Sequence, residues 1–221
     1  MGILIAIEGV DGAGKQTLTR AIAHELDDRG KDVIRIGFPR YGESVHADLA
    51  AEALRGEHGD LATSVHAMAL LFALDRRSAL GDLQRLINRH DVVMLDRYVA
   101  SNAAYSAARL REDGDGAVVR WIEELEFDRF GLPKPDLQLL VTVPVEVAQE
   151  RAKRREEQDS DRARDSYERD SDLQTRTAAI YGQLADKGWI SAWQKVDNAA
   201  NDAAAVAQHA NELVNQLFRP H

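Results

Sequence analysis

The 221-residue sequence contains no cysteine, which excludes disulfide bonds, thiolate metal sites and cysteine nucleophiles. It also lacks any apolar run near the roughly 20 residues that a membrane-spanning helix requires. No basic segment precedes the glycine-rich motif that begins at Gly9, so a cleaved signal peptide is not expected. Together these absences favour a cytoplasmic protein that has no membrane partner.

Positive charge is also scarce. The chain carries 28 Lys and Arg residues against 37 Asp and Glu residues, which gives a formal net charge of -9. Because nucleic acids and anionic membranes bind basic surfaces, this balance argues against a nucleic-acid partner. The 7 histidines show no H-x-x-x-H spacing, and no G-x-S-x-G motif occurs. A zinc site and a serine-hydrolase elbow are therefore not expected.

Short apolar runs that are typical of buried strands alternate along the chain with longer helical patterns. Strands are predicted at Ile3–Ile7, Val33–Phe38, Val92–Leu95, Leu137–Val143 and Trp189–Val196. Helices are predicted from Lys15 to near Gly30 and at Ser44–Leu54, Ser64–Arg89, Asn102–Leu110, Val118–Phe127, Leu173–Leu184 and Ala203–Phe218. This alternation predicts a single α/β domain over residues 1–221, with a parallel sheet and helices on both faces.

A glycine-rich loop follows the first predicted strand and precedes the first predicted helix. It fits the pattern G-x-x-x-x-G-K in the strand–loop–helix context that the phosphate-binding loop (P-loop) requires. Such a loop turns backbone N–H groups inward, the helix N-terminus adds a positive dipole, and the lysine reaches the β- and γ-phosphates. The residues predicted to bind the phosphates of ATP are Gly9, Val10, Asp11, Gly12, Ala13, Gly14, Lys15, Gln16 and Thr17.

One position of this loop departs from the usual pattern. The residue after the lysine is ordinarily Ser or Thr, whose hydroxyl binds Mg²⁺, but here it is Gln16, with Thr17 next. An amide oxygen is a poorer anchor for this metal than a hydroxyl in that position. We therefore expect Mg²⁺ to depend on carboxylates and on the nucleotide itself.

A second pattern typical of nucleotide-binding sheets is the strand Val92–Leu95, which ends in Asp96. In a P-loop protein such an acid lies near the magnesium ion, although an acid at a strand end is also a common helix cap. Arg97 follows directly, at the carboxyl end of the strand, where parallel sheets bind their ligands. We expect Arg97 to bind a phosphate, and the alternative is a surface salt bridge.

The segment from about 146 to 165 is rich in Arg and Lys and poor in apolar residues. One interpretation is a mobile lid that brings an arginine to the phosphate being transferred. The other is a solvated helix with charge pairs at i, i+4 spacing. Arg151 and Arg155 are the first candidates for the lid arginine.

Taken together, the motifs resemble those of the thymidylate kinases. The fragments that carry the resemblance extend in family order from about Ile3 to Tyr181: IAIEGVDGAGK, FPRYG, FALDR, VVMLDRYVASNAAYSAA, GLPKPD and ARDSYERD. The loop alone indicates only a phosphate-binding protein. The run Asp96 to Tyr98, followed by the segment Ser101–Tyr105, is far more specific to this family.

The resemblance implies a binding site for dTMP. Phe72 resembles the ring that stacks on thymine, and Arg76 resembles the donor to thymine O4. Asn102 is similar to the residue that contacts the N3 edge of the base. Tyr105 resembles the ring that lies under the deoxyribose and crowds out a 2′-hydroxyl group.

The resemblance also implies roles around the phosphates. Phe38 and Pro39 resemble the wall near the base and its methyl group, and Tyr41 resembles a residue near the dTMP phosphate. Arg97 resembles the arginine that holds this phosphate beside the transferred one. Asp11 resembles the acid that orients Arg97 and the metal.

Two further acids, Asp165 and Glu168, resemble residues near the sugar and in the Mg²⁺ shell. The resemblance therefore adds Asp165 to the dTMP site and gives Asp11 and Glu168 as the metal ligands. The expected catalytic residues are Lys15, Arg97, Asp11, Arg151 and Arg155.

The implied enzyme transfers the γ-phosphate of ATP to dTMP, giving dTDP and ADP for dTTP synthesis. Its implied cofactor is Mg²⁺, and its implied assembly is a homodimer. A nucleoside monophosphate kinase for another base remains an alternative. A second alternative is a GTPase-type switch that uses the QKVD segment Gln194–Asp197, which is close to the guanine-reading N-K-x-D motif. Against it, Asp96 is not followed by the spacing of a switch loop.

Overall fold

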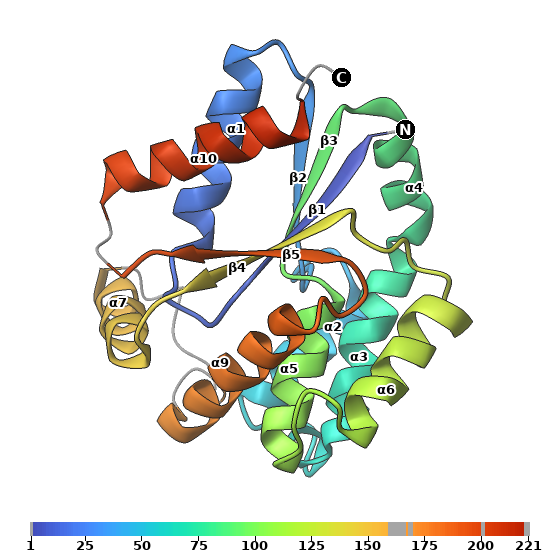
Figure 1. Cartoon of the computed structure of the whole chain (residues 1–221). Coiled ribbons are helices and arrows are strands. Elements are labelled where there is room, and N and C mark those ends of the chain that lie inside the picture. Colours follow the sequence, from blue (N-terminus) through green and yellow to red (C-terminus); the bar gives the residue numbers. More distant parts are fainter. Residues whose placement is uncertain (1, 159–166, 168–169, 200–201, 219–221) are drawn as a thin grey trace.

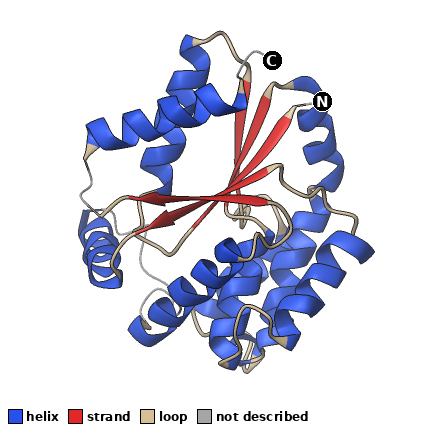
Figure 2. Ribbon diagram, viewed as in Figure 1, coloured by secondary structure: helices blue, strands red, loops and turns tan. Residues whose placement is uncertain are grey.

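The computed structural model describes residues 2–158, 167, 170–199 and 202–218, and for 155–158 it describes the backbone alone. Five parallel strands form one sheet in the order β2-β3-β1-β4-β5 (Figures 1 and 2). The strands are β1 (Ile3–Glu8), β2 (Val33–Gly37), β3 (Val92–Asp96), β4 (Leu137–Thr142) and β5 (Ala192–Asp197). The predicted α/β fold with a parallel sheet is thus confirmed.

The three central strands, β3, β1 and β4, are almost entirely buried. Ile5 pairs with Met94 on one side and with Leu137 on the other. Ile5, Met94 and Leu139 are all 0% exposed. Strands that helices cover on both faces appear in a sequence as unbroken apolar runs, which explains why these three strands were predictable. The edge strands β2 and β5 are only partly buried.

Helices cover both faces of the sheet, as Figure 1 shows. On one face α1 (Lys15–Asp28) packs against α10 (Ala203–Leu217), and on the other α5 (Val99–Leu110) packs against α9 (Ser171–Asp186). The other described helical elements are α2 (Val45–Leu54), η1 (Leu61–Thr63), α3 (Val65–Ser78), α4 (Leu80–Arg89), α6 (Ala117–Glu123), η2 (Glu124–Arg129) and α7 (Val145–Gln158). Within the described ranges, no helix combines the length and apolarity that a membrane span needs.

The prediction of one continuous helix over Ser64–Arg89 is wrong, because the chain forms α3 and α4 with a turn at Ala79. The carbonyl oxygen of Asp75 accepts hydrogen bonds from Ser78 Oγ at 2.7 Å and from Arg40 Nη2 at 2.8 Å. These donors compete with the backbone N–H of Ala79, which lies 3.3 Å from the same oxygen. The competition weakens the helical hydrogen-bond ladder, and α4 begins after the turn.

The predicted helix over Val118–Phe127 also changes character along its length. It begins as α6 and continues as η2, a π-helical segment in which Phe130 N donates to Leu125 O, five residues back, at 3.0 Å. This wider turn contains Glu126, whose side chain is 0% exposed. An apolar pattern in the sequence does not reveal such a change of helical spacing.

The predicted lid segment begins with α7. Ala148 and Ala152 of this helix are only 2% and 3% exposed, so its first half is anchored to the body of the protein. The backbone of Ala148 contacts the P-loop at Gly12. Residues 159–165 of the predicted lid lie outside the described residues.

Candidate active site

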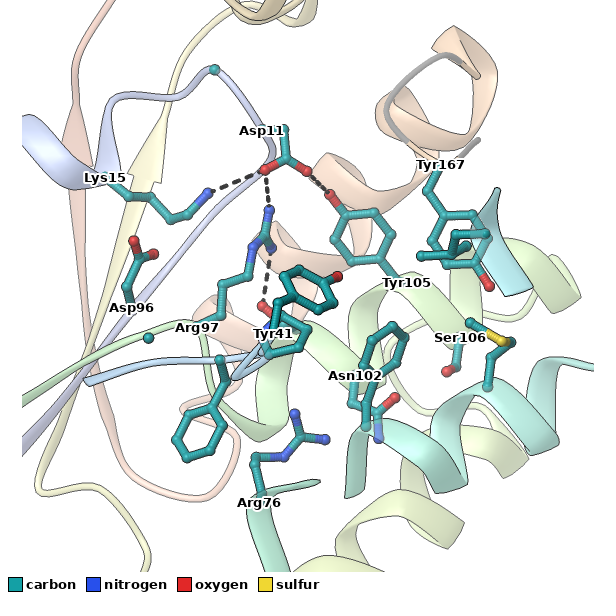
Figure 3. A pocket seen from close by; sticks show the side chains of 18 of the residues that line it. Asp11, Lys15, Tyr41, Arg76, Asp96, Arg97, Asn102, Tyr105, Ser106 and Tyr167 are labelled. Atoms are coloured by element: carbon teal, nitrogen blue, oxygen red, sulfur yellow. Dashed lines mark hydrogen bonds and ion pairs between the residues drawn. The ribbon is translucent and has the colours of Figure 1, made fainter. Parts of the chain in front are cut away.

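The carboxyl ends of β1 and β3 border a cavity of about 530 Å³, shown in Figure 3. The structure brings most of the predicted site residues together here. Those that line the cavity are Asp11, Gly12, Gly14, Lys15, Gln16, Thr17, Phe38, Pro39, Tyr41, Phe72, Arg76, Arg97, Asn102, Tyr105 and Arg151. Gly9, Val10 and Ala13 belong to the same loop but are not among its lining residues.

At Gly12 and Gly14 the P-loop has a shape that only glycine permits. Gly12 and Gly14 have φ angles of 80° and 95°, in the left-handed region. A Cβ atom would lie 2.0 Å from Ala148 O if added to Gly12, and 2.1 Å from Asn198 Nδ2 if added to Gly14. Asn198 Nδ2 also donates to Ala13 O at 2.8 Å. The loop is therefore held tightly between α7 and the residue that follows β5.

Lys15 begins α1 and is nearly buried, at 8% exposure. Its Nζ donates to the carbonyl oxygens of Gly9 and Val10, both at 3.1 Å, and lies 3.9 Å from Asp11 Oδ1. Burial lowers the pKa of the Lys15 ammonium, and the charge of Arg97 lowers it further. A nucleotide phosphate would replace two neutral acceptors with a charged one, which makes a stronger hydrogen bond.

Arg97 follows β3 in a left-handed conformation, with φ 66°, which is strained for a residue other than glycine. Its backbone N–H donates to Ile7 O at 2.9 Å and holds this turn against β1. Its Nη2 donates to Asp11 Oδ1 at 2.6 Å, and its guanidinium lies 5.4 Å from the centre of the Tyr105 ring. Tyr105 Oη donates to Asp11 Oδ2 at 3.0 Å, so three side chains meet at one point (Figure 3).

The electrostatics of this corner keep Asp11 ionised. Burial alone would raise the pKa of the Asp11 carboxyl, but the charges of Arg97 and Lys15 outweigh it and hold this pKa well below its ordinary value. Burial likewise would lower the pKa of the Arg97 guanidinium, but the Asp11 charge raises it well above its ordinary value. Both groups therefore carry full charge at neutral pH.

A second acid, Glu8, lies behind Arg97 and is 0% exposed. Its carboxylate accepts hydrogen bonds from Tyr98 N at 2.8 Å, from Ser101 Oγ at 2.6 Å and from Tyr181 Oη at 3.1 Å. Arg97 Nη1 donates to the same two hydroxyl oxygens, at 3.1 Å and 3.4 Å. Burial raises the pKa of Glu8 despite these hydrogen bonds. Glu8 thus holds the two hydroxyl groups that contact Arg97.

The opposite end of the cavity is mainly apolar. Met68 and Leu54 pack in a small cluster with Ala50 and Ala53, and Phe72 packs against this cluster. Met68, Leu54 and Phe72 all line the cavity. A flat apolar pocket with a few polar groups is the usual setting for an aromatic ligand.

Two polar side chains, Arg76 of α3 and Asn102 of α5, face this apolar end (Figure 3). Glu126 of η2 contacts both. Its carboxylate accepts from Arg76 Nε at 2.5 Å and Nη2 at 2.7 Å, and from Asn102 Nδ2 at 2.8 Å. Burial would lower the pKa of the Arg76 guanidinium, but the Glu126 charge raises it above its ordinary value. Arg76 is therefore a fully charged residue at a buried position.

The segment Phe38–Tyr41 is held against α3 by Arg40. Arg40 N and Nε donate to the Asp75 carboxylate at 3.0 Å and 2.9 Å, and Asp75 is 0% exposed. This pair closes one wall of the cavity. Tyr41 lies at its edge with 51% exposure.

On the α7 side, Arg151 lines the cavity. Its Nη2 donates to the carbonyl oxygens of Asn198 at 3.1 Å and Ala199 at 3.0 Å. Its Nη1 is buried and has no hydrogen-bond partner among the described residues. An unpartnered buried N–H group favours a bound anion. Asp165, Glu168 and the side chain of Arg155 lie outside the described residues.

The cavity also offers oxygen atoms that suit a hydrated magnesium ion. Asp96, at the end of β3, lines the cavity, and its Oδ1 is buried without a partner within the part of the chain that the structure describes. The exposed side chains of Gln16 and Thr17 lie at the same end. Both carboxylate oxygens of Asp11 already accept hydrogen bonds. The donor set fits Mg²⁺, which keeps several waters and needs few protein ligands.

Several functional residues were missed by the sequence analysis. Glu8 left a signal, because a single acid ends an otherwise apolar strand. Glu126 left none, because Glu123 and Glu124 precede it and only the fold shows which of the three points inward. The other cavity-lining residues that were not predicted as site residues are Gly37, Leu54, Met68, Ala69, Ser101, Ser106, Arg109 and Tyr167.

The segment Gln194–Asp197, which raised the GTPase alternative, lies within the edge strand β5 and not in a loop after it. Lys195 forms an exposed ion pair with Asp186 at 2.6 Å. None of these four residues is among the described residues that line the cavity.

Comparison with known proteins gives consistent matches. Residues 7–202 match the family model described as thymidylate kinase. Thymidylate kinases of Mycobacterium tuberculosis strains CDC 1551 / Oshkosh and ATCC 25618 / H37Rv are 58% identical over 191 residues, which cover 86% of this chain and 89% of each relative. That of Xanthomonas euvesicatoria pv. vesicatoria (strain 85-10) is 32% identical over 217 residues, covering 96% of this chain and 83% of the relative. The solved structure of thymidylate kinase from Candida albicans is 24% identical in sequence. The match covers 97% of this chain and 92% of that chain, and its TM-score of 0.73 shows a shared fold.

Proposed function

Because the chain belongs to the thymidylate kinase family, we propose that its cavity binds the phosphates of ATP at the Lys15 end and dTMP at the Phe72 end. The enzyme transfers the γ-phosphate of ATP to dTMP and gives dTDP and ADP. Figure 3 shows Arg97 between Lys15 and Arg76, where the two substrates would meet.

The observation that carries this arrangement is the convergence of two cations on one carboxylate. Arg97 Nη2 and Lys15 Nζ lie 2.6 Å and 3.9 Å from the same oxygen of Asp11. Charge that develops on the transferred phosphoryl group would lie between them and be stabilised by both. The P-loop from Gly9 to Thr17 would hold the phosphates of ATP through its backbone N–H groups.

The proposed placement of dTMP follows from the same geometry. Arg97 would hold the dTMP phosphate, with Tyr41 beside it at the cavity edge. Tyr105, which is fixed by its hydrogen bond to Asp11, would lie under the deoxyribose. The thymine ring would stack on Phe72, a ring that lines the apolar end of the cavity.

The base would be bordered by Phe38 and Pro39 and read by Arg76 and Asn102, which all line the same cavity. Asp165, which would lie near the sugar, remains a prediction from the resemblance alone.

The reaction needs no covalent intermediate. The attacking phosphate oxygen of dTMP is already ionised, so positioning and charge stabilisation suffice and no general base is required. Bound Mg²⁺ would neutralise charge on the β- and γ-phosphates. Asp96 Oδ1, which has no partner among the residues that the structure describes, would face the hydrated shell of this ion. The ligand roles of Asp11 and Glu168 stay predictions.

The assignment of the lid follows from Arg151. We propose that residues 146–165 form the lid of a single kinase domain. Arg151 would meet the transferred phosphate through its Nη1, which has no hydrogen-bond partner among the described residues. Arg155 stays the second candidate.

A homodimer and a cytoplasmic location are likewise proposals. An apolar residue on α3, Leu70, is 39% exposed and supports a contact with a second copy, which sedimentation or size-exclusion measurements would detect.

The test of the site assignment is Arg97→Met, compared with the wild type by calorimetric titration. We expect dTMP to bind about 100-fold more weakly, because a charge-assisted bidentate contact is lost. Thymidine, which has no phosphate, should bind both proteins equally. An equal loss of affinity for dTMP and for thymidine would contradict the placement of the phosphate at Arg97. An ADP-release assay with dTMP, dUMP, dCMP, dGMP and dAMP would measure the preference for the base.

A further inference from the structure

Glu126 is a carboxylate with no predicted role, and it lies directly behind the base end of the cavity. It is 0% exposed and is not among the described residues that line the cavity. Among the described residues, its carboxylate forms hydrogen bonds with two side chains that do line the cavity, Arg76 and Asn102. A buried charge of this kind is costly unless every oxygen is satisfied, and these two residues satisfy it.

The contacts with Glu126 and with the Ala69 carbonyl oxygen together fix which way the Asn102 amide faces. Asn102 Nδ2 has two hydrogens: one is donated to Ala69 O at 3.0 Å, and the other to Glu126 Oε1 at 2.8 Å. Both acceptors lack hydrogens of their own, so the reversed amide would place Oδ1 against two other oxygens. The amide nitrogen is therefore committed to the protein. Oδ1, which has no donor partner among the described residues, is the atom left for a ligand.

Glu126 fixes Arg76 in the same way. Arg76 Nε and Nη2 both donate to the carboxylate in a two-pronged contact, at 2.5 Å and 2.7 Å. This arrangement leaves Nη1 without a partner among the described residues, on a side chain that lines the cavity. The base end therefore presents one acceptor, Asn102 Oδ1, and one donor, Arg76 Nη1.

We propose that Glu126 sets this acceptor–donor pattern and is thereby the positioning residue that selects a 4-oxo pyrimidine over a 4-amino pyrimidine. The inference rests on the proposed function, in which Arg76 and Asn102 read the base. Thymine offers N3–H to the acceptor and O4 to the donor. Cytosine offers an unprotonated N3 and a 4-amino group, so both contacts would place like against like. Buried polar groups left unpaired in this way give strong discrimination.

Replacing Glu126 with glutamine tests the pattern with almost no change of shape. In either orientation of the new amide, its NH₂ group faces an N–H donor: Arg76 Nε in one orientation, and both Arg76 Nη2 and Asn102 Nδ2 in the other. In the second orientation the variant no longer accepts from Asn102, so the Asn102 amide loses one of the two contacts that fix it. When this amide turns, Oδ1 accepts from the new NH₂ group but opposes Ala69 O, and Nδ2 enters the cavity and suits the N3 atom of cytosine. The variant should therefore lose the preference for dTMP as well as affinity for it.

The experiment measures kcat/KM for dTMP and dCMP at saturating ATP in Glu126→Gln. We expect the dTMP/dCMP ratio to fall about 100-fold, mainly through a higher KM for dTMP, with the KM for ATP unchanged. Glu124→Gln is the matched control, because Glu124 is an exposed glutamate of the same π-helical segment and pairs with Arg129. It should leave both substrates unaffected. Equal losses for dTMP and dCMP in Glu126→Gln would reduce Glu126 to a structural role and overturn the inference.

Two further variants separate the possible failures. Glu126→Asp keeps only acceptor oxygens, so it should keep the dTMP preference; if it loses that preference as Glu126→Gln does, packing and not hydrogen-bond character decides, and the inference is wrong. A loss of the dTMP preference in Glu126→Asp would overturn the inference even if Glu126→Gln does not fold. Asn102→Ala tests the proposed function itself. If Asn102→Ala leaves the dTMP/dCMP ratio unchanged, the base end is misassigned. If Asn102→Ala changes this ratio and Glu126→Gln does not, only the role of Glu126 is refuted.

Discussion

The two ends of the cavity hold an arginine by different means. At the end of the cavity that is proposed to bind the phosphates, called the phosphate end, Arg97 pairs with Asp11. Both side chains keep some exposure, 15% and 21%. At the base end Arg76 pairs with Glu126, and these side chains are 4% and 0% exposed. The first acid lines the cavity, whereas the second lies behind it.

Because of this difference, the polar groups of the phosphate end can rearrange when a ligand binds, whereas those of the base end are fixed beforehand. Asp11 can contact a ligand, a metal or Lys15, so the charges around Arg97 can rearrange when a phosphate enters. Glu126 has no such access, and the polar pattern that it imposes on the base end is present before any ligand binds. The rate of transfer should therefore depend on the phosphate end and the choice of base on the base end.

The largest effect is expected at the centre of the phosphate end. Lys15→Met should lower kcat about 1000-fold, because its ammonium stabilises charge that appears only in the transition state. Its fold and its dTMP/dCMP preference should be retained. Lys195→Met, on the exposed edge strand, is the control and should behave as the wild type. A folded Lys15→Met enzyme of near-normal activity would refute the role of the loop.

The next effect concerns the metal. Asp96→Asn should lower kcat about 100-fold at limiting Mg²⁺ and be partly rescued by excess Mg²⁺, because it removes a charge from the metal shell. Gln16→Ala should change the Mg²⁺ dependence little. A titration of kcat with Mg²⁺ measures both. If Gln16→Ala is the impaired variant and Asp96→Asn is normal, the amide is the true ligand.

A smaller effect is expected where the two ends meet, at Tyr105. Tyr105→Ala should narrow the preference for dTMP over ribothymidine monophosphate about tenfold, since the ring no longer opposes a 2′-hydroxyl group. Tyr105→Phe keeps the ring and should keep the preference, although it loses the hydrogen bond to Asp11. The comparison is made on kcat/KM for both nucleotides. A preserved ratio in Tyr105→Ala would exclude the ring as the source of selectivity.

The smallest effect is on stability and its pH dependence. The pKa of Asp11 is lowered in the fold, so its contribution to the free energy of unfolding is complete above its ordinary value of 3.8 and is lost as the pH falls through the folded pKa. Asp11→Asn should be less stable than the wild type by about 2 kcal/mol at neutral pH. Urea unfolding should show this gap closing below about pH 4. A gap that does not depend on pH would show that the ion pair contributes nothing.

Much of the phosphate end was predictable because it is built from neighbouring residues. The loop from Gly9 to Lys15 and the pair Asp96 and Arg97 each form a short run at the end of an apolar strand, so spacing alone located them. The central strands were predictable for the same reason. The base end, in contrast, joins α3, α5 and η2, which are far apart in the sequence.

What the sequence could not supply depends on long-range contacts. The turn at Ala79 follows from donors that reach the Asp75 carbonyl, one of them on Arg40. The choice of Glu126 as the buried glutamate follows from the π-helical turn. Neither of these two features produces a periodic pattern in the sequence. The base contacts of Phe72 and Arg76 stay predictions that rest on the family resemblance and not on their pattern, which would equally suit an ordinary helix face.

The central claim, that base selection and phosphate positioning belong to separate ends, is tested most directly by a double-mutant cycle of the two buried glutamates. Dissociation constants of dTMP and dCMP are measured for Glu8→Gln, Glu126→Gln and the double variant. Glu8→Gln should weaken both nucleotides in equal proportion, Glu126→Gln should lower the dTMP/dCMP ratio, and the double variant should show the sum within about 0.5 kcal/mol. A changed ratio in Glu8→Gln, or a coupling above about 1 kcal/mol, would show that the ends act as one unit through α5, on which Ser101 and Asn102 are adjacent.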